Sequence, residues 1–170
     1  MLFVCTGNIC RSPIAERLAA ALARRHDIAD LVTSSAGTRA VIGHAMHPEA
    51  SRVLAGLGGD STDFVARQLT STVASRAHLI LTMTKAHRDT VLGHAPRQLS
   101  RTFTLAEAAF LASEAGAREV DDLAELRPRL SKQPHSDILD PIGGSPELFE
   151  AVGNRIATLL PPILRLCQSG

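Results

Sequence analysis

The sequence contains no tryptophan and no tyrosine, and only five phenylalanines among 170 residues. The chain therefore has no tyrosine that could itself be phosphorylated. It has only three cysteines, an odd number that fits a reducing compartment better than a disulfide framework. Their spacing offers no four-ligand zinc site, so we expect no metal.

Long apolar runs and clusters of basic residues are also missing. No stretch of 18 apolar residues is present, and the first strand-like segment begins at Leu2, which leaves no room for a secretory signal. We therefore expect a cytoplasmic protein with no membrane partner. The formal net charge is +1 and the basic residues are scattered, so no nucleic-acid partner is expected either.

Length and composition indicate one domain. With 45% hydrophobic residues and no linker or internal repeat, residues 1–170 can share one core. Apolar β-prone runs alternate with helical periodicity, which favours an α/β fold with a parallel sheet and helices on both faces. The expected strands are 2–4, 31–34, 78–82 and 98–103, and the expected helices are 13–25, 47–57, 85–92, 105–112, 119–130 and 146–160. The last helix is expected to begin after a Ser145 cap and to end at Pro161.

The most informative segment is CTGNICRSP at residues 5–13, which follows an apolar run and precedes a helical one. Five residues between Cys5 and Arg11 allow the backbone to curl with its N–H groups inward, and the following helix N-terminus favours an anion. Arg11 adds a planar, two-pronged donor that matches a phosphate. The same positive environment stabilises a thiolate on Cys5. The segment thus predicts a phosphate-binding loop after the first strand, with Cys5 as nucleophile.

The other residues of this loop fit the same interpretation. Gly7 is expected to allow a positive φ and close backbone approach, and Asn8 to take a left-handed conformation and brace the loop with its amide. Ser12 is expected to cap the helix and to donate to the Cys5 sulfur, with Pro13 at the first helical position. The expected substrate-binding residues all belong to the loop: Thr6, Gly7, Asn8, Ile9, Cys10 and Ser12.

A carboxylic acid is also required, because loss of a phosphoryl group from an alcohol needs a proton on the departing oxygen. Asp140 is the candidate. It lies in a Pro-, Ser- and Gly-rich stretch, residues 133–145, which predicts a loop able to reach across the sheet. Pro141 restricts Asp140 to an extended backbone. From spacing alone, the Asp-Pro pair could equally begin a turn.

The loop and its preceding valine resemble the signature V-C-x-G-N-I-C-R-S-P of the low-molecular-weight protein tyrosine phosphatases, in their bacterial branch. The resemblance continues, less specifically, through residues 35–38, 66–69, 79–83 and 140–141. It implies a single domain with a four-stranded parallel sheet and flanking helices. It also implies a phosphorylated protein as the substrate, and we expect a monomer or weak dimer.

The resemblance further implies a two-step reaction without metal or organic cofactor. Cys5 attacks phosphorus while Asp140 protonates the leaving oxygen, and Asp140 then activates the water that hydrolyses the phosphocysteine. The catalytic residues expected from the family are Cys5, Arg11 and Asp140. A non-catalytic phosphopeptide-binding module is the alternative from another class, and it would be expected to lose Cys5 or Asp140.

Cys10 has two compatible interpretations. It can be a small buried filler, or it can form a reversible disulfide with Cys5 on oxidation, as the family suggests. Cys167 is expected to be inert, and His44 and His87 are expected at the surface or in loops. Arsenate reductases share the fold but need further cysteines in the middle of the chain, which this sequence does not have.

The substrate is less clear from the residues. The pattern D-P-x-G-G-S at 140–145 is similar to that of a branch that includes protein-arginine phosphatases. Those members tend to carry a threonine where this chain has Ile9. An isoleucine offers an apolar surface to an aryl ring, so Ile9 favours phosphotyrosine as the substrate. The aromatic residues that family members commonly place around the pocket are absent, and residues 142–144 (Ile-Gly-Gly) and 39–42 (Arg-Ala-Val-Ile) stand at those places. We therefore expect the entrance of the substrate pocket to be small and lined by aliphatic side chains.

Overall fold

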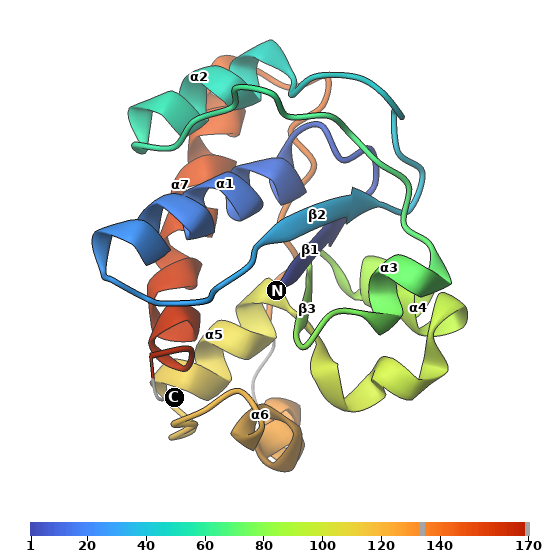
Figure 1. Cartoon of the computed structure of the whole chain (residues 1–170), viewed down its shortest axis with the longest axis vertical. Helices are drawn as coiled ribbons and strands as arrows, with labels where there is room; N and C mark the ends of the chain where they lie inside the picture. Colours follow the sequence, from blue (N-terminus) through green and yellow to red (C-terminus); the bar gives the residue numbers. More distant parts are fainter. Residues whose placement is uncertain (133–134, 169–170) are drawn as a thin grey trace.

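The computed structural model describes residues 1–132 and 135–168, which form a four-stranded sheet with helices on both faces (Figure 1). The strand order is β2-β1-β3-β4 and every pair is parallel. The strands are β1 Leu2–Cys5, β2 Ser34–Gly37, β3 Ile80–Thr82 and β4 Thr102–Thr104. The expected fold class is confirmed.

The two faces of the sheet bury alternate side chains of the strands. Phe3, Leu81 and Phe103 point into a large core covered by α1 (Arg11–Arg25), α2 (Pro48–Gly56), α5 (Leu105–Ser113) and α7 (Pro146–Arg165). Leu2, Val4 and Ile80 point into a smaller core covered by α3 (Ser71–Ser75) and α4 (Lys85–His94). Near-continuous apolar strands are the pattern that a parallel sheet with two covered faces requires.

The second and fourth strands differ from expectation. The second strand is not 31–34, because the residues that pair with β1 are Ser34–Gly37, while Val32 is 76% exposed. A Cβ on Gly37 would lie 2.4 Å from the Thr6 carbonyl oxygen, so a small residue is needed beside β1. The fourth strand is short because Pro96–Arg101 form a 3-10 helix before Thr102–Thr104.

Three of the expected helices differ from the structure, and one helix was not expected. The helix α1 begins at Arg11, with Cys10 and not Ser12 at the N-cap. The helix α7 runs on through Pro161 and Pro162 to Arg165, because Ile163 and Leu164 are buried in the large core. The expected helix 119–130 is divided into α6 (Asp122–Leu126) and a 3-10 helix (Arg127–Lys132). The short helix α3 was missed.

The other helices lie within two residues of their expected ends. Ser145 is the N-cap residue of α7, as expected, but its side chain makes no capping hydrogen bond. Among the described residues, no helix is long and apolar enough to cross a membrane.

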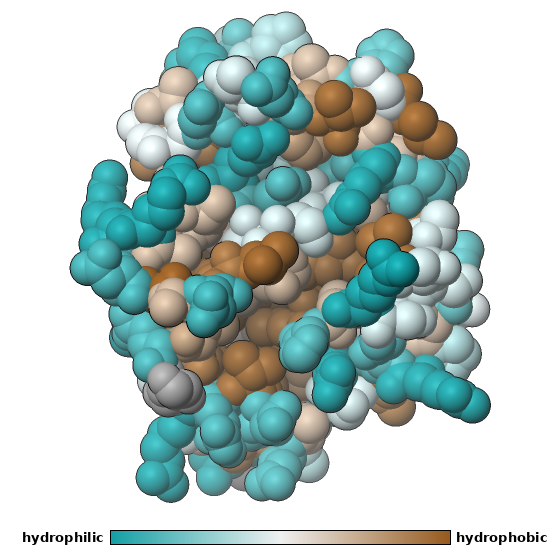
Figure 2. Space-filling view, viewed as in Figure 1, coloured by the Kyte–Doolittle hydropathy of each residue, from teal (hydrophilic) through white to brown (hydrophobic). Residues whose placement is uncertain are grey.

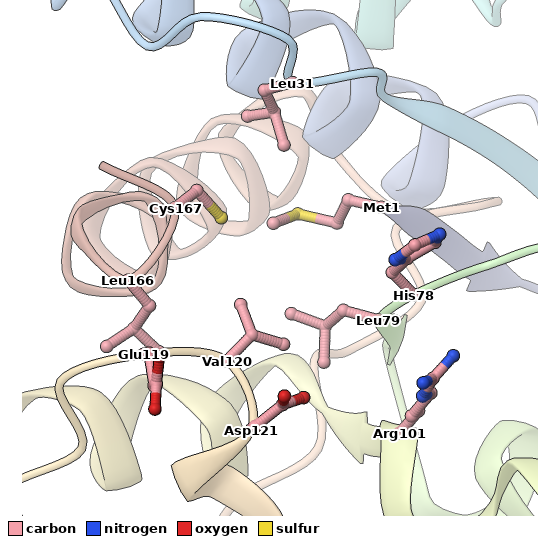
Figure 3. Close-up of a pocket in the computed structure, with 10 residues that line it drawn as sticks. All are labelled: Met1, Leu31, His78, Leu79, Arg101, Glu119, Val120, Asp121, Leu166 and Cys167. Atoms are coloured by element: carbon pink, nitrogen blue, oxygen red, sulfur yellow. The ribbon is translucent and has the colours of Figure 1, made fainter. Parts of the chain in front are cut away.

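The amino ends of the strands carry a hollow surface around Met1. One hollow of about 370 Å³ is lined by Met1, Leu79 and Val120 among others, and an adjoining one of about 650 Å³ extends over Val32 and Val73. Figure 2 shows an apolar surface in this region, bordered by hydrophilic side chains. In Figure 3 the apolar side chains of Met1, Leu79 and Val120 point into the first hollow.

Candidate active site

The loop between β1 and α1 lies at the opposite, carboxyl edge of the sheet. Its carbonyl groups point outward, because the N–H groups of Thr38, Arg39 and Val41 bond the carbonyls of residues 5, 6 and 7 at 2.9, 3.0 and 2.9 Å. The His47 N–H likewise bonds the Ile9 carbonyl at 2.8 Å. In a trans peptide the following N–H points the opposite way. The loop therefore turns its N–H groups inward, as predicted.

These inward N–H groups have no hydrogen-bond partner in the described part of the chain. Within residues 1–132 and 135–168, the backbone N–H groups of residues 7–10 donate no hydrogen bond to the chain. Asn8 takes the left-handed conformation, with a φ of 55°, as expected. Gly7 is not among the positive-φ glycines, so that expectation was wrong, since Asn8 alone makes the tight turn. A cradle of free N–H donors is the arrangement that binds an oxyanion.

The Asn8 amide braces the loop through three hydrogen bonds. Its Oδ1 accepts from the Arg67 N–H at 2.9 Å, so its Nδ2 donates to Ser12 Oγ at 2.9 Å and to Ser35 Oγ at 2.8 Å. Ser35 in turn donates to Glu16 Oε2 at 2.5 Å. Asn8 is fully buried, and these bonds use the oxygen and both protons of its amide. The loop is thus held from segments far away in the sequence.

The direction of these bonds determines what Ser12 can do. Because Ser12 Oγ accepts from Asn8, its own proton is free to point to Cys5 Sγ, which lies 2.9 Å away. Ser12 is buried in the first turn of α1 and does not cap it. The expected capping role was wrong, whereas the expected contact with the Cys5 sulfur is present in the structure.

Arg11 and Asp140 meet beside the cradle. Arg11 Nη2 lies 2.6 Å from Asp140 Oδ2, and Nη1 donates to the Ile138 carbonyl at 3.1 Å. The Ile138 N–H is bonded to the Met83 carbonyl at 2.8 Å, which ties the Asp140 loop to the end of β3. Within the described chain, Arg11 Nε is buried and has no hydrogen-bond partner. One donor of the guanidinium is therefore left unused by the described chain.

A hollow of about 430 Å³ opens over the loop. Ile9, Val41 and Ile142 form apolar walls, and Asp140, with a side chain 48% exposed, lies at the edge. Arg39 also lines the hollow, with no ion pair within the described residues, and no motif in the sequence pointed to it as a site residue. The expected site residues that line the hollow are Cys5, Thr6, Gly7, Ile9, Cys10, Arg11 and Asp140, while Asn8 and Ser12 lie behind it.

The two loop cysteines are both free and buried. Burial, with Cys5 and Asp140 close by, raises the pKa of the Cys10 thiol to about 12. Cys10 therefore stays protonated at neutral pH and is not a second nucleophile. Whether it forms a disulfide with Cys5 stays a prediction.

His87 was expected at the surface or in a loop, and this was wrong, because it is buried and lies in α4. It is only 7% exposed, and its Nε2 lies 2.8 Å from Thr6 Oγ1 in the loop. The spacing Thr84-x-x-His87 at the start of α4 was the available signal, because a threonine N-cap bonds the N–H three residues on.

Comparison with known proteins agrees with the expected family. A family model described as low molecular weight phosphotyrosine protein phosphatase matches residues 1–124. The probable low molecular weight protein-tyrosine-phosphatase EpsP of Ralstonia nicotianae is 37% identical over 107 residues, which are 63% of this chain and 70% of that protein. The protein-arginine-phosphatase of Geobacillus stearothermophilus is 30% identical over 169 residues, which are 99% of this chain and 96% of that protein.

The similar solved structures also include both an arginine phosphatase and a tyrosine phosphatase. A cysteine-to-serine mutant of the arginine phosphatase YwlE, with a phosphorylated active-site serine, has a TM-score of 0.78 and 26% identity, covering 99% of this chain and 95% of its own. The tyrosine phosphatase AmsI of Erwinia amylovora has a TM-score of 0.73 and 29% identity, covering 96% of this chain and 89% of its own.

All of these relatives are named phosphatases, which are hydrolases. The chain belongs to the low molecular weight phosphotyrosine protein phosphatase family.

Proposed function

We propose that this chain is a cysteine-dependent protein-tyrosine phosphatase that acts through a phosphocysteine intermediate. The observation that carries the proposal is the convergence of Cys5, Arg11 and Asp140 on one hollow at the carboxyl edge of the sheet. The family match ends at residue 124, so the role of Asp140 rests on its 2.6 Å contact with Arg11 and on its place at the mouth.

The cradle would hold the phosphoryl group through the free N–H groups of the loop and through Arg11. The unpartnered Nε of Arg11 supplies one donor, and Nη2 supplies another when it exchanges Asp140 for a phosphoryl oxygen. Thr6, Gly7, Ile9 and the rest of the loop bind substrate mainly through their backbone. Charge that develops on the equatorial oxygens is then met by donors already in position.

The first step breaks the bond between phosphorus and the tyrosine oxygen. Cys5 Sγ forms the S–P bond, and the departing oxygen takes a proton from the carboxylic acid of Asp140. The side chain of Asp140 is half exposed at the mouth, where a leaving group would emerge.

The second step returns the enzyme to its starting state. The Asp140 carboxylate takes a proton from water, whose oxygen attacks phosphorus, and the S–P bond breaks to release phosphate and the Cys5 thiolate. The Ser12 hydroxyl, whose Oγ lies 2.9 Å from Sγ, donates its proton to that thiolate and stabilises it as it leaves.

The apolar walls support phosphotyrosine as the substrate. Ile9, Val41 and Ile142 offer an apolar surface to an aryl ring, whereas a guanidinium would need polar partners there. Phosphoarginine is the second candidate, since the arginine phosphatase of Geobacillus stearothermophilus matches over 99% of this chain. A non-catalytic phosphopeptide-binding module is a third, and the presence of both Cys5 and Asp140 argues against it.

The test is turnover by the purified, reduced protein in EDTA, with phosphotyrosine and phosphoarginine peptides side by side. Fast phosphotyrosine hydrolysis that is lost in Cys5→Ser and kept in the matched control Cys167→Ser supports the proposal. A preference for phosphoarginine supports the second candidate. Binding of phosphopeptides without turnover in the unmodified protein supports the third.

A further inference from the structure

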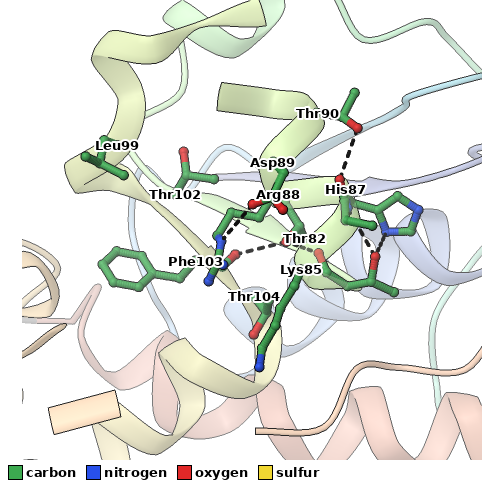
Figure 4. Close-up of polar contacts among 12 residues, drawn as sticks. Thr82, Lys85, His87, Arg88, Asp89, Thr90, Leu99, Thr102, Phe103 and Thr104 are labelled. Atoms are coloured by element: carbon green, nitrogen blue, oxygen red, sulfur yellow. Dashed lines mark hydrogen bonds and ion pairs between the residues drawn. The ribbon is translucent and has the colours of Figure 1, made fainter. Parts of the chain in front are cut away.

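His87 connects the start of α4 to the phosphate-binding loop, although it stands 81 residues from Thr6 in the sequence. Its Nε2 lies 2.8 Å from Thr6 Oγ1, and its Nδ1 lies 2.9 Å from Thr84 Oγ1. The Thr84 hydroxyl also accepts the His87 N–H at 3.1 Å and so caps α4. Figure 4 shows the ring projecting from the first turn of this helix. Both ring nitrogens are therefore held.

The segment from Met83 to His87 also holds the loop that carries Asp140. The Met83 carbonyl accepts the Ile138 N–H at 2.8 Å, and the Lys85 N–H donates to Asp137 Oδ1 at 3.0 Å. The junction of β3 and α4 thus contacts the nucleophile loop through His87 and the acid loop through two backbone groups. A change in this junction would move both sides of the hollow relative to each other.

The ring is neutral at neutral pH. Burial, together with the nearby Arg11 guanidinium, lowers the pKa of His87 to about 4, although Asp140 and Asp137 oppose the shift. A neutral imidazole has one N–H. Nδ1 lies next to the positive N-terminal end of α4, which favours a lone pair over an N–H at that place. The Thr84 hydroxyl can then donate its proton to Nδ1. Nε2 then carries the hydrogen and donates to Thr6.

We propose that His87 is a positioning residue for phosphoryl transfer, whose Nε2–H holds Thr6 Oγ1 and so fixes the loop directly after Cys5. This inference rests on the proposed phosphatase function and deepens it. Thr6 lines the hollow, whereas His87 is not among the described residues that line it. His87 therefore acts through Thr6 and does not touch substrate. A fixed Thr6 orients the N–H groups that follow it toward a phosphoryl group.

Two substitutions of His87 separate the hydrogen bond from packing. In His87→Gln the amide nitrogen replaces Nε2 and can still donate to Thr6, whereas in His87→Asn the amide reaches only the Nδ1 place near Thr84. We expect kcat for a phosphotyrosine peptide to fall about 10- to 100-fold in His87→Asn, with KM changed less than about threefold, and to recover to within about threefold of the unmodified enzyme in His87→Gln. His94→Asn, an exposed histidine of the same helix, is the matched control and should change neither constant.

A double-mutant cycle with Thr6→Val identifies the partner. If His87 acts through Thr6, the double variant Thr6→Val, His87→Asn loses no more kcat than the worse single variant. Melting temperatures of all variants exclude simple unfolding. Unchanged kcat in His87→Asn, a His87→Gln variant as slow as His87→Asn, or additive losses in the double variant would overturn the inference. Failure of the proposed function itself is distinct, because the unmodified enzyme would then show no Cys5-dependent turnover.

Discussion

The two edges of the sheet are both hollow, yet only the carboxyl edge carries the groups of the proposed active site. The amino edge around Met1 has hollows of about 370 and 650 Å³, and the carboxyl edge around Cys5 has one of about 430 Å³. At the carboxyl edge, the candidate nucleophile Cys5, the Arg11 guanidinium and the Asp140 carboxyl group converge within a network of directed hydrogen bonds. At the amino edge, the polar side chains of His78, Arg101 and Asp121 make no hydrogen bond or ion pair within the described chain.

This difference teaches that convergent polar groups, and not volume, distinguish a reactive site. Parallel strands bring the loops that follow them to one edge, so groups from residues 5–12, 38–42, 83–87 and 138–142 meet there. The amino edge collects the segments that enter the strands. Its hollow is lined by apolar side chains that include Met1, Leu31, Leu79 and Val120, and by the polar side chains of His78, Arg101, Glu119 and Asp121.

Removing the nucleophile should have the largest effect at the carboxyl edge. We expect Cys5→Ser to lower kcat for a phosphotyrosine peptide by at least about 10³-fold, because the serine hydroxyl is not ionised at neutral pH. Isothermal titration with vanadate or phosphate should still detect binding in the cradle. Turnover by Cys5→Ser near the unmodified rate would place the chemistry elsewhere.

Removing the acid should have the next largest effect. We expect Asp140→Asn to lower kcat by about 10²- to 10³-fold for phenyl phosphate, and less for p-nitrophenyl phosphate, whose leaving group needs no proton. Steady-state kinetics with both substrates measure the ratio. An equal loss on the two substrates would show that Asp140 acts by positioning Arg11 and not as an acid.

The buried His87 should make the region beside the loop sensitive to acid. Its pKa is 6.5 when unfolded and about 4 when folded, so the stability due to the neutral ring is complete above pH 6.5 and is lost as the pH falls toward 4. Over that interval the native protein should lose about 3 kcal/mol more unfolding free energy than His87→Gln. Urea unfolding at several pH values tests this, and parallel curves for the two proteins would contradict it.

Ile9, in the wall of the hollow, should affect the preference between phosphotyrosine and phosphoarginine. We expect Ile9→Thr to change the ratio of phosphotyrosine to phosphoarginine turnover by about tenfold in favour of phosphoarginine, because it replaces an apolar wall with a hydroxyl. Competition between the two peptides in one reaction measures the ratio directly. Val32→Thr, at an exposed site on the amino edge, is the control and should leave the ratio unchanged.

The smallest effect is expected at the amino edge. Asp121→Asn removes a charge from the hollow around Met1, and we expect kcat and KM to stay within about twofold of the unmodified enzyme. The same peptide assay measures both constants. A loss comparable to that of Asp140→Asn would mean that the two edges are coupled and that the contrast between them is false.

Local features of this protein were predictable from the sequence. The strand, loop and helix at residues 2–25 were expected within two residues, because residues 5–13 contain turn, anion-binding and helix signals close together. The β2 strand was misplaced because Ser34–Gly37 has little β-propensity and is chosen by pairing with β1. The helix α7 passes two prolines because buried side chains beyond them outweigh the lost hydrogen bonds.

The sequence by itself determined the phosphate-binding loop, the candidate nucleophile Cys5 and the expected fold class, since these depend on spacings within a few residues of the chain. Only the tertiary structure decided which groups hold that loop: Ser35, Arg67 and His87 lie 27, 59 and 81 residues from their partners. It also brought Asp140 to 2.6 Å from Arg11, across 129 residues. No local pattern encodes such contacts, because they arise only when parallel strands carry their following loops to one edge of the sheet.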